Sequence, residues 1–259
     1  MNKFVFLAIV ASFNIVTVQA QQSKSNVNVD NAIQIGGAAV GASNKQSFEL
    51  GNASNGGKAN VKAGTAAQIG GAGVGAINNQ NLTLGNATNG GKSNVNVGAA
   101  IQAGGAGVGA INNQKLAVGN ASGAGSSSNV MAGTILQAGG AGIGSANKQT
   151  MEIGNASGGG KSNVQLGFGT QLGGAAIGAS NNQTVKIGNA NSGGKSNVAM
   201  PAVVQIGGAG IAASNKQNIE IGNAANGQTT NVRTGAIVQA GGAVLGTTNN
   251  QSLRLGNAN

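Results

Sequence analysis

The sequence has no cysteine, histidine, tryptophan or tyrosine, and its 259 residues include one proline and four acidic side chains. Without cysteine there can be no disulfides, and without histidine or cysteine the usual bases, nucleophiles and soft metal ligands are missing. The four carboxylates, Asp30, Glu49, Glu152 and Glu220, are scattered along the chain, which argues against a calcium site or a catalytic carboxylate pair. We therefore expect no enzyme activity, no cofactor and no metal site.

Large apolar side chains are also scarce. Glycine contributes 49 residues, and beyond residue 20 the only aromatic residues are Phe48 and Phe168. A globular domain of this length would bury many large side chains, so this composition does not favour a conventional core. Repeated backbone pairing can take its place, and the alternative is a chain that stays disordered until it assembles.

The first twenty residues have the layout of a secretory signal peptide. Lys3 precedes an apolar run from Phe4 to Val18, and Val18-Gln19-Ala20 is a small-residue cleavage signal. We predict cleavage after Ala20, secretion of the remainder, a short segment at 21–24, and a repeat array over 25–259. No later segment is apolar for long enough to span a membrane.

The array repeats a Gly-Asn-Ala motif. Its glycine recurs every 34 residues, or 35 in one case, at positions 51, 85, 119, 154, 188, 222 and 256. A fixed period of this size is typical of stacked repeats. We predict an all-β fold, a parallel β-solenoid or cross-β-like stack of seven 34-residue coils, with partial disorder before assembly as the open alternative.

Within a repeat the apolar period is two, which indicates strands. From Val27 to Ile35, branched apolar residues at 27, 29, 33 and 35 predict one half-buried strand. Gly36-Gly37 predicts a corner, Ala38 to Ala42 a second extended piece, Asn44 to Gln46 a polar bend, and Ser47 to Leu50 a third strand.

Two features predict a local distortion. Pro201 replaces Asp30 within the first strand of its repeat and lacks a backbone donor. Residue 31, taken as inward-facing, varies from Asn31 to Phe168 along the array, too widely for tight packing. We expect a distorted coil or local disorder there.

Several polar positions are identical in all seven repeats, among them those of Asn26, Gln34, Asn44, Gln46 and Asn52. Stacked amides can donate in one direction and accept in the other, so these positions predict amide ladders, although tandem duplication alone would also leave identical copies. The candidate ladder residues are Gln34, Gln68, Gln102, Gln137, Gln171, Gln205 and Gln239, with Asn52, Asn86, Asn120, Asn155, Asn189, Asn223 and Asn257.

Charged positions support stacking and suggest partners. The position of Glu49 reads Glu, Thr, Ala, Glu, Lys, Glu and Arg along the repeats, which places opposite charges on neighbouring coils. Lys58, Lys92, Lys161 and Lys195 recur at the turn tips and are candidates for contact with polyanions, meaning acidic matrix proteins, polysaccharide or a mineral surface. A solvated edge is the alternative. Nucleic acid is disfavoured because aromatic stacking residues are missing.

The GNASNGGK-type repeats, exported and rich in glycine, alanine and asparagine, resemble the organic matrix proteins of mollusc shell. The likeness is one of composition, and silk-like, eggshell and curli-type proteins share it. It implies a secreted, self-associating framework component of calcified layers. The alternatives are an ice-binding β-solenoid and a silk, eggshell or adhesive fibre protein.

Overall fold

The computed structural model describes much of the chain, and every regular element in this part is a β-strand. The described residues are 14–19, 24–36, 39–40, 43–53, 57–71, 73–75, 77–89, 91–105, 107–109, 111–123, 125, 127–140, 142–144, 146–158, 161–173, 176–178, 180–190, 195–208, 211, 214–224, 229–241, 246 and 248–256. No described helix could cross a membrane.

Each repeat contributes a long strand and a shorter strand that returns past it, and five repeats add a two-residue strand between them. The long strands are β2 (Lys24–Ile35), β5 (Lys58–Ile69), β8 (Lys92–Ala103), β11 (Ser127–Ala138), β14 (Lys161–Leu172), β17 (Lys195–Ile206) and β19 (Thr230–Ala240). The returning strands are β4 (Ser43–Asn52), β7 (Ile77–Leu84), β10 (Ile111–Val118), β13 (Ala146–Ile153), β16 (Ser180–Ile187), β18 (Ser214–Ile221) and β20 (Thr248–Leu255). The two-residue strands are β3 (Ala39–Val40), β6 (Gly73–Val74), β9 (Gly107–Val108), β12 (Gly142–Ile143) and β15 (Ala176–Ile177).

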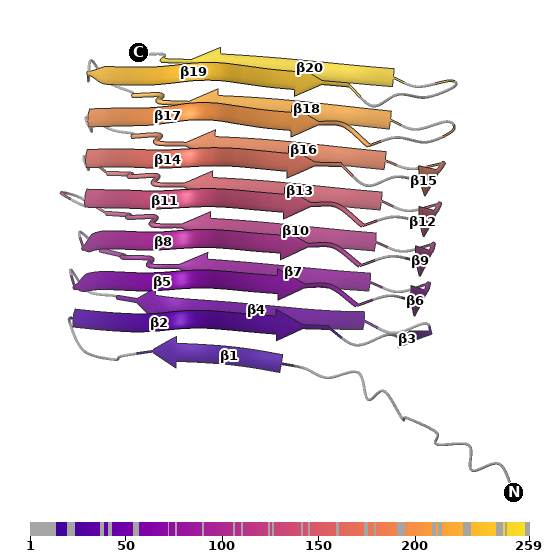
Figure 1. Ribbon diagram of the computed structural model, residues 1–259, viewed down its shortest axis with the longest axis horizontal. Helices are drawn as coiled ribbons and strands as arrows, with labels where there is room; N and C mark the ends of the chain where they lie inside the picture. The colour runs from indigo at the N-terminus through magenta and orange to yellow at the C-terminus, as the bar shows by residue number, and fades with distance from the viewer. Residues whose placement is uncertain are drawn as a thin grey trace, which may run out of the picture.

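Equivalent strands of successive repeats pair in parallel and in register, so the chain winds into a solenoid (Figure 1). The long strands form one sheet from β2 to β19, and the returning strands form a second sheet that ends at β20. The predicted all-β parallel solenoid with a repeat of about 34 residues is confirmed. Below, a column is the set of residues at one position of all repeats, named by its first member.

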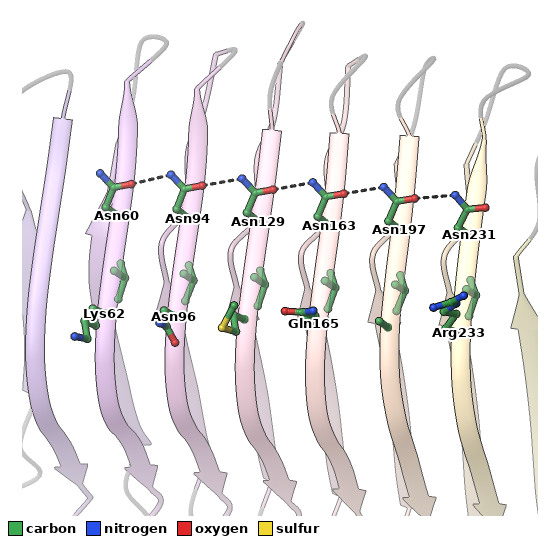
Figure 2. Close-up of a pocket in the computed structure, with 18 of the residues that line it drawn as sticks. Asn60, Lys62, Asn94, Asn96, Asn129, Asn163, Gln165, Asn197, Asn231 and Arg233 are labelled. Atoms are coloured by element: carbon green, nitrogen blue, oxygen red, sulfur yellow. Dashed lines mark hydrogen bonds between the residues drawn. The ribbon is translucent and has the colours of Figure 1, made fainter.

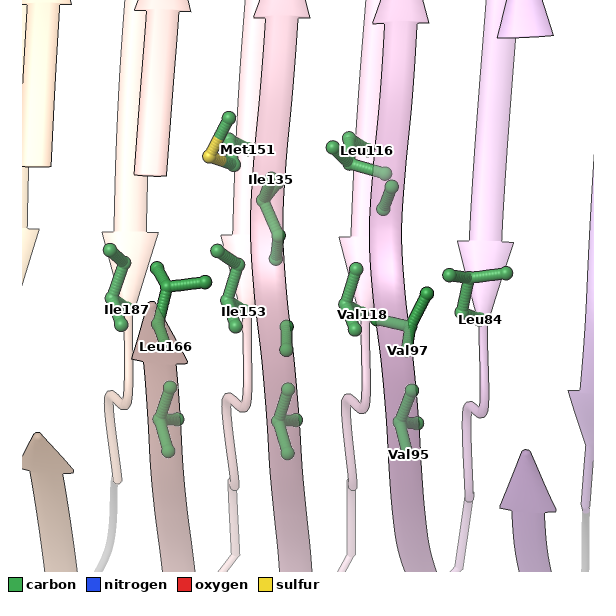
Figure 3. Packing of buried hydrophobic residues seen from close by; sticks show 14 of the residues in the cluster. Leu84, Val95, Val97, Leu116, Val118, Ile135, Met151, Ile153, Leu166 and Ile187 are labelled. Carbon is green, nitrogen blue, oxygen red and sulfur yellow. The ribbon is translucent and has the colours of Figure 1, made fainter. Parts of the chain in front are cut away.

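The hydrophobic core is a thin layer between the two large sheets (Figure 3). Returning strands contribute pairs such as Leu116 and Val118, and long strands contribute Val95 and Val97, all at most 3% exposed. Because each coil places a similar set above the last, small and medium side chains are enough to fill this layer. The structure therefore has a hydrophobic core, which runs along the stack as a narrow layer of repeated side chains.

A bulge in every long strand changes which side chains face this core. Ladder pairing skips the Asp30 column, and in a strand such as β5 the buried positions change from odd, at Val61 and Ala63, to even, at Ala66 and Gln68. Both paired strands skip the same column, so the register is unchanged, but the side chains that follow face the opposite way. The prediction that 27, 29, 33 and 35 share a face is therefore wrong: Ile33 is 60% exposed.

The same bulge corrects the prediction for residue 31. This column faces outward, and its Phe168 is 56% exposed, so its variation does not disturb packing. The inward column is the next one, which includes Ala66, Ala100 and Ile135, each fully buried.

Pro201 does not interrupt β17, and the expected distortion is limited to the pairing of β17 with β14. It lies in the bulge column, which is skipped when β17 pairs with β14 and with β19, and β17 runs without interruption. Toward β14 the pairing also lacks the step from Leu166 to Met200, whose equivalent between Ala132 and Leu166 is present one repeat earlier, so the missing backbone donor of proline coincides with the loss of one ladder step.

The polar bend predicted at 44–46 is also wrong, because these residues lie inside β4 and its equivalents. Their polar side chains had suggested a turn. Position 46 instead faces inward, since Gln46 is 4% exposed.

Strand β1 (Asn14–Gln19) lies within the predicted signal peptide and pairs with β4 in parallel. Its register places Thr17 beside Glu49. β1 thus occupies the edge of β4 that an earlier coil would hold. The signal peptide remains a prediction, as do the boundaries of the segments that follow it.

Candidate functional site

The Gln34 column forms an unbroken ladder through the interior. In each step the side-chain Nε2 donates to the Oε1 of the glutamine one repeat earlier, at 2.7–2.9 Å from Gln68 through Gln239. Five of these seven side chains are fully buried: Gln68, Gln102, Gln137, Gln171 and Gln205. A buried amide is costly unless it is paired, and here its partner is its own copy.

These glutamines also join the two sheets. Gln102 donates to the carbonyl oxygen of Lys115 at 3.1 Å, and Gln137 donates to that of Thr150 at 3.2 Å. In the reverse direction, Gln183 of β16 donates to the carbonyl oxygen of Ile206 at 3.2 Å. The sheets are held together by hydrogen bonds as well as by apolar contact, which compensates for the thin core.

A second buried ladder, in the Asn44 column, has the opposite polarity. Asn78, Asn112, Asn147 and Asn181 each donate through Nδ2 to the Oδ1 of the asparagine one repeat later, at 2.9 Å. Most of these asparagines also donate to a glycine carbonyl seven residues earlier, as Asn112 does to Gly105 at 3.2 Å. These bonds fix the Gly-Gly corner at Gly71, Gly105, Gly140 and Gly208.

The Gln46 column is interrupted. Gln80 donates to Gln46 at 3.1 Å, and Gln183 donates to Gln149 at 3.0 Å. Between them, neither amide atom of Gln114 has a hydrogen-bond partner among the described residues. Identical residues in one column therefore do not guarantee an unbroken ladder.

In the described part of the Asn52 column, Asn52 to Asn223, the expected amide-to-amide ladder is replaced by another arrangement. Instead, side-chain oxygens of Asn120, Asn155 and Asn189 each accept from the backbone N–H of the asparagine one repeat later, at 3.2 Å. Asn52 accepts in the same way from Asn86 at 3.4 Å. Asn257 lies outside the described residues.

The repeated Gly-Asn-Ala glycine has a geometric reason to be glycine. All seven copies have a positive φ, between 59 and 68°. A Cβ on Gly119 would lie 2.2 Å from Cγ2 of Val130. The carbonyl oxygen of Gly119 accepts a hydrogen bond from the hydroxyl of Ser128. Sequence reasoning missed this serine, although the Lys-Ser-Asn triplet that recurs after the turns contained the signal.

Opposite charges meet in the Glu49 column near the C-terminal end. Glu220 lies 3.9 Å from Lys186 and 4.0 Å from Arg254. Glu152 pairs instead with Lys115, at 3.4 Å, on the neighbouring strand but in a different column. Each of these partly exposed ion pairs stabilises the fold by less than about 1 kcal/mol, so their main effect is to favour the observed strand register.

The outer face of the long-strand sheet carries a third ladder, in the Asn26 column (Figure 2). Neighbouring asparagines are joined at 2.7–3.0 Å from Asn26 to Asn231. Beside it runs a mixed column that includes Lys62, Asn96 and Arg233, and together they line a groove of about 1210 Å³ across all seven long strands. Each amide uses one donor and one acceptor in the ladder, which leaves further hydrogen-bonding capacity for a ligand.

The candidate polyanion contacts lie on this same face. Lys58, Lys92, Lys161 and Lys195 each open a long strand, two residues before the Asn26 ladder, and all are exposed. Ser127 separates Lys92 from Lys161 in the register, and Lys161 pairs directly with Lys195. With strands about 4.8 Å apart, the face presents a linear series of cations beside a series of amides.

Among the residues that the structure describes, no three acidic side chains come together in a group that could hold a metal ion. No family model, no curated protein and no solved structure matches this chain.

Proposed function

We propose that this protein is a secreted structural protein, a self-associating framework component of an extracellular organic matrix. The observation that carries the proposal is the continuous Gln34 ladder, which joins all seven coils through buried hydrogen bonds. Stacked identical layers resist deformation without disulfides or a large core, and they repeat a cross-β arrangement that further molecules can extend.

The test is to locate the native protein. Mass spectrometry of an acid-insoluble extracellular extract should detect its tryptic peptides, and fibre diffraction of the enriched material should show a reflection near 4.8 Å. Recovery only from soluble body fluid or from cytosol would contradict a framework role.

The finer proposal, a framework of calcified shell layers, rests on the compositional resemblance to mollusc shell matrix proteins. The chain has few carboxylates, so a scaffold fits it better than direct calcium binding. Silk, eggshell and adhesive fibres are alternatives that differ in tissue, and the same extraction, performed on each tissue, separates them.

We further propose that the lysine face binds polyanions of the matrix, either acidic proteins, sulfated polysaccharide or a mineral surface. A triple change of Lys92, Lys161 and Lys195 to glutamine should weaken binding to immobilised chondroitin sulfate about tenfold. The matched control changes Lys45, Lys148 and Lys216, an exposed column on the other sheet, and should retain binding. Equal losses in the two variants would show that only net charge matters.

Ice binding is a second function that a parallel solenoid would suit. A flat face with regular threonine columns would favour it, but here the outward-facing column after the bulge alternates the partly buried Thr65 and Ala99 with the exposed Thr134 and Phe168. We expect no thermal hysteresis at millimolar protein. Measurable hysteresis would replace the framework proposal with this one.

A further inference from the structure

The last coil of the solenoid carries only positive charges, and the first coil carries two acidic side chains beside two lysines. Both arginines of the chain, Arg233 and Arg254, lie in the last coil, on β19 and β20. The only aspartate, Asp30, and one of three glutamates, Glu49, lie in the first coil, on β2 and β4. Arg233 and Asp30 are exposed, and the side chain of Arg254 is 63% exposed.

These charges match if the register continues from one molecule to the next. One more 34-residue step beyond β20 would place Glu49 of a second copy against Arg254, repeating the contact that Arg254 makes with Glu220 within the chain. The step beyond β19 places Asn28 against Arg233, so Asp30 is two residues along the same strand and within reach of the long arginine side chain.

No like charges meet in this arrangement. The other charged residues of β2 and β4 are Lys24 and Lys45, and the same continuation places them against Thr229 and Asn250. At the junction, each charged side chain therefore lies against either an uncharged residue or a residue of opposite charge.

The amide ladders also have matching ends. In the Gln34 column each residue donates to the one before, so a following copy would donate from its Gln34 to Oε1 of Gln239. In the Asn26 column it would donate from Asn26 to Oδ1 of Asn231. The sheet of long strands ends at β2 and β19, and each of these edges can accept a parallel strand.

We propose that molecules join end to end, with β19 and β20 of one copy pairing in parallel with β2 and β4 of the next, and that Arg254–Glu49 and Arg233–Asp30 pairs set the register. This inference rests on the proposed self-association and specifies its geometry. It gives a polar filament in which the 34-residue step passes without a break from one chain to another.

Strand β1 occupies the edge of β4 that β20 of the neighbouring copy requires. The predicted cleavage after Ala20 removes β1, so joining would begin only once the chain has been exported. The unprocessed chain keeps that edge covered.

The test uses the protein as released by a secreting host, with its N-terminus read by mass spectrometry. One variant reverses the C-terminal end, Arg233→Glu with Arg254→Glu, and the other reverses the N-terminal end, Asp30→Lys with Glu49→Lys. Each alone should raise the critical concentration for assembly, measured by sedimentation, about tenfold. An equimolar mixture should return to the wild-type value, because each reversed end then meets an opposite charge.

The control, Lys148→Glu with Lys216→Glu, makes the same change in net charge as the Arg233→Glu, Arg254→Glu variant, but in inner coils, and should assemble with no such increase. Arg254 and Glu49 contact residues of their own chain, so Arg233→Glu mixed with Asp30→Lys repeats the test at positions without ion pairs in the described chain. Far-UV circular dichroism confirms that each variant is folded.

Wild-type-like assembly of the single variants, or failure of the mixture to recover, would overturn end-to-end joining. If the wild type still forms insoluble material in that case, the framework function stands and its contacts are lateral. If the wild type does not assemble at all, both the joining and the self-association fail.

Discussion

At the scale of single residues, the amide side chains explain why so many positions are identical. Glutamine and asparagine carry two N–H donors and a carbonyl oxygen with two acceptor sites on one planar group, so a copy placed one layer away can both donate and accept. Serine or leucine at one position would leave the amides of the two neighbouring layers without a hydrogen-bond partner on that side. The Gln34 column is fully paired, whereas Gln114 in the Gln46 column shows that identity alone does not produce pairing.

Replacing Gln137 by leucine should lower the free energy of unfolding by about 2–4 kcal/mol. The change removes the donor to Gln102 at 2.8 Å and the acceptor for Gln171 at 2.7 Å, and both partners are buried. Urea denaturation measures the loss. Asn129→Ala in the exposed ladder is the control and should cost less than about 1 kcal/mol. Similar costs at the two sites would show that burial is not the reason for the effect.

The glycine of the Gly-Asn-Ala motif provides a second comparison. Gly119→Ala should destabilise the protein by about 3 kcal/mol, because φ is 65° and the new Cβ would lie 2.2 Å from Val130. Gly125 has φ 74° but nothing within 4 Å of an added Cβ, so Gly125→Ala should cost about 1 kcal/mol. The difference between the two thermal midpoints isolates the packing contribution, and equal shifts would contradict it.

At the scale of elements, the bulge in each long strand decides which residues are buried. It moves Gln34 inside and leaves Ile33 and Ile35 outside, at 60% and 62% exposure. Glycine repeats in this column, and a Cβ at Gly133 would lie 2.5 Å from the carbonyl oxygen of Gly98. The bulge therefore stacks on itself, coil after coil.

Proline provides the test of the bulge. Pro201→Gly should change the free energy of unfolding by less than about 1 kcal/mol, because the backbone N–H that glycine adds can restore the missing ladder step beside Met200, while the greater chain entropy of glycine offsets this gain. Val204→Pro, three residues along the same strand, should cost about 2 kcal/mol or more, since Val204 lies in register with Thr170 and Val238. A large cost at position 201 would show that its backbone matters after all.

At the scale of the whole molecule, each coil contacts only its neighbours, so stability is a sum over adjacent layers. Coils in the middle have two neighbours and the last coil has one within the chain. The exposed fractions reflect this: Leu255 is 41% exposed, whereas its equivalents Ile187 and Ile221 are fully buried.

The same substitution should therefore cost less at the end of the stack. Gln239 is partly buried and donates to Gln205, so Gln239→Leu should cost less than half as much as Gln137→Leu in dilute solution. Hydrogen exchange should show the same order, with faster exchange in β19 and β20 than in β11. Under conditions where molecules assemble, the difference should shrink as the end becomes covered. Equal costs in the monomer would indicate that the solenoid unfolds as one cooperative unit.

The sequence by itself determined the all-β class, the parallel stack and its 34-residue step, because the Gly-Asn-Ala motif and the alternating apolar residues recur at that spacing. It also identified Gln34 and its copies as stacked amides, since only a residue's own copy satisfies both ends of a buried amide. Tertiary structure decided the facing of side chains beyond Asp30 and the position of Pro201. It also decided that side-chain oxygens of the Asn52 column accept from backbone N–H groups. A bulge or a turn shifts facing by a single residue, and only the geometry of neighbouring coils shows where that shift occurs.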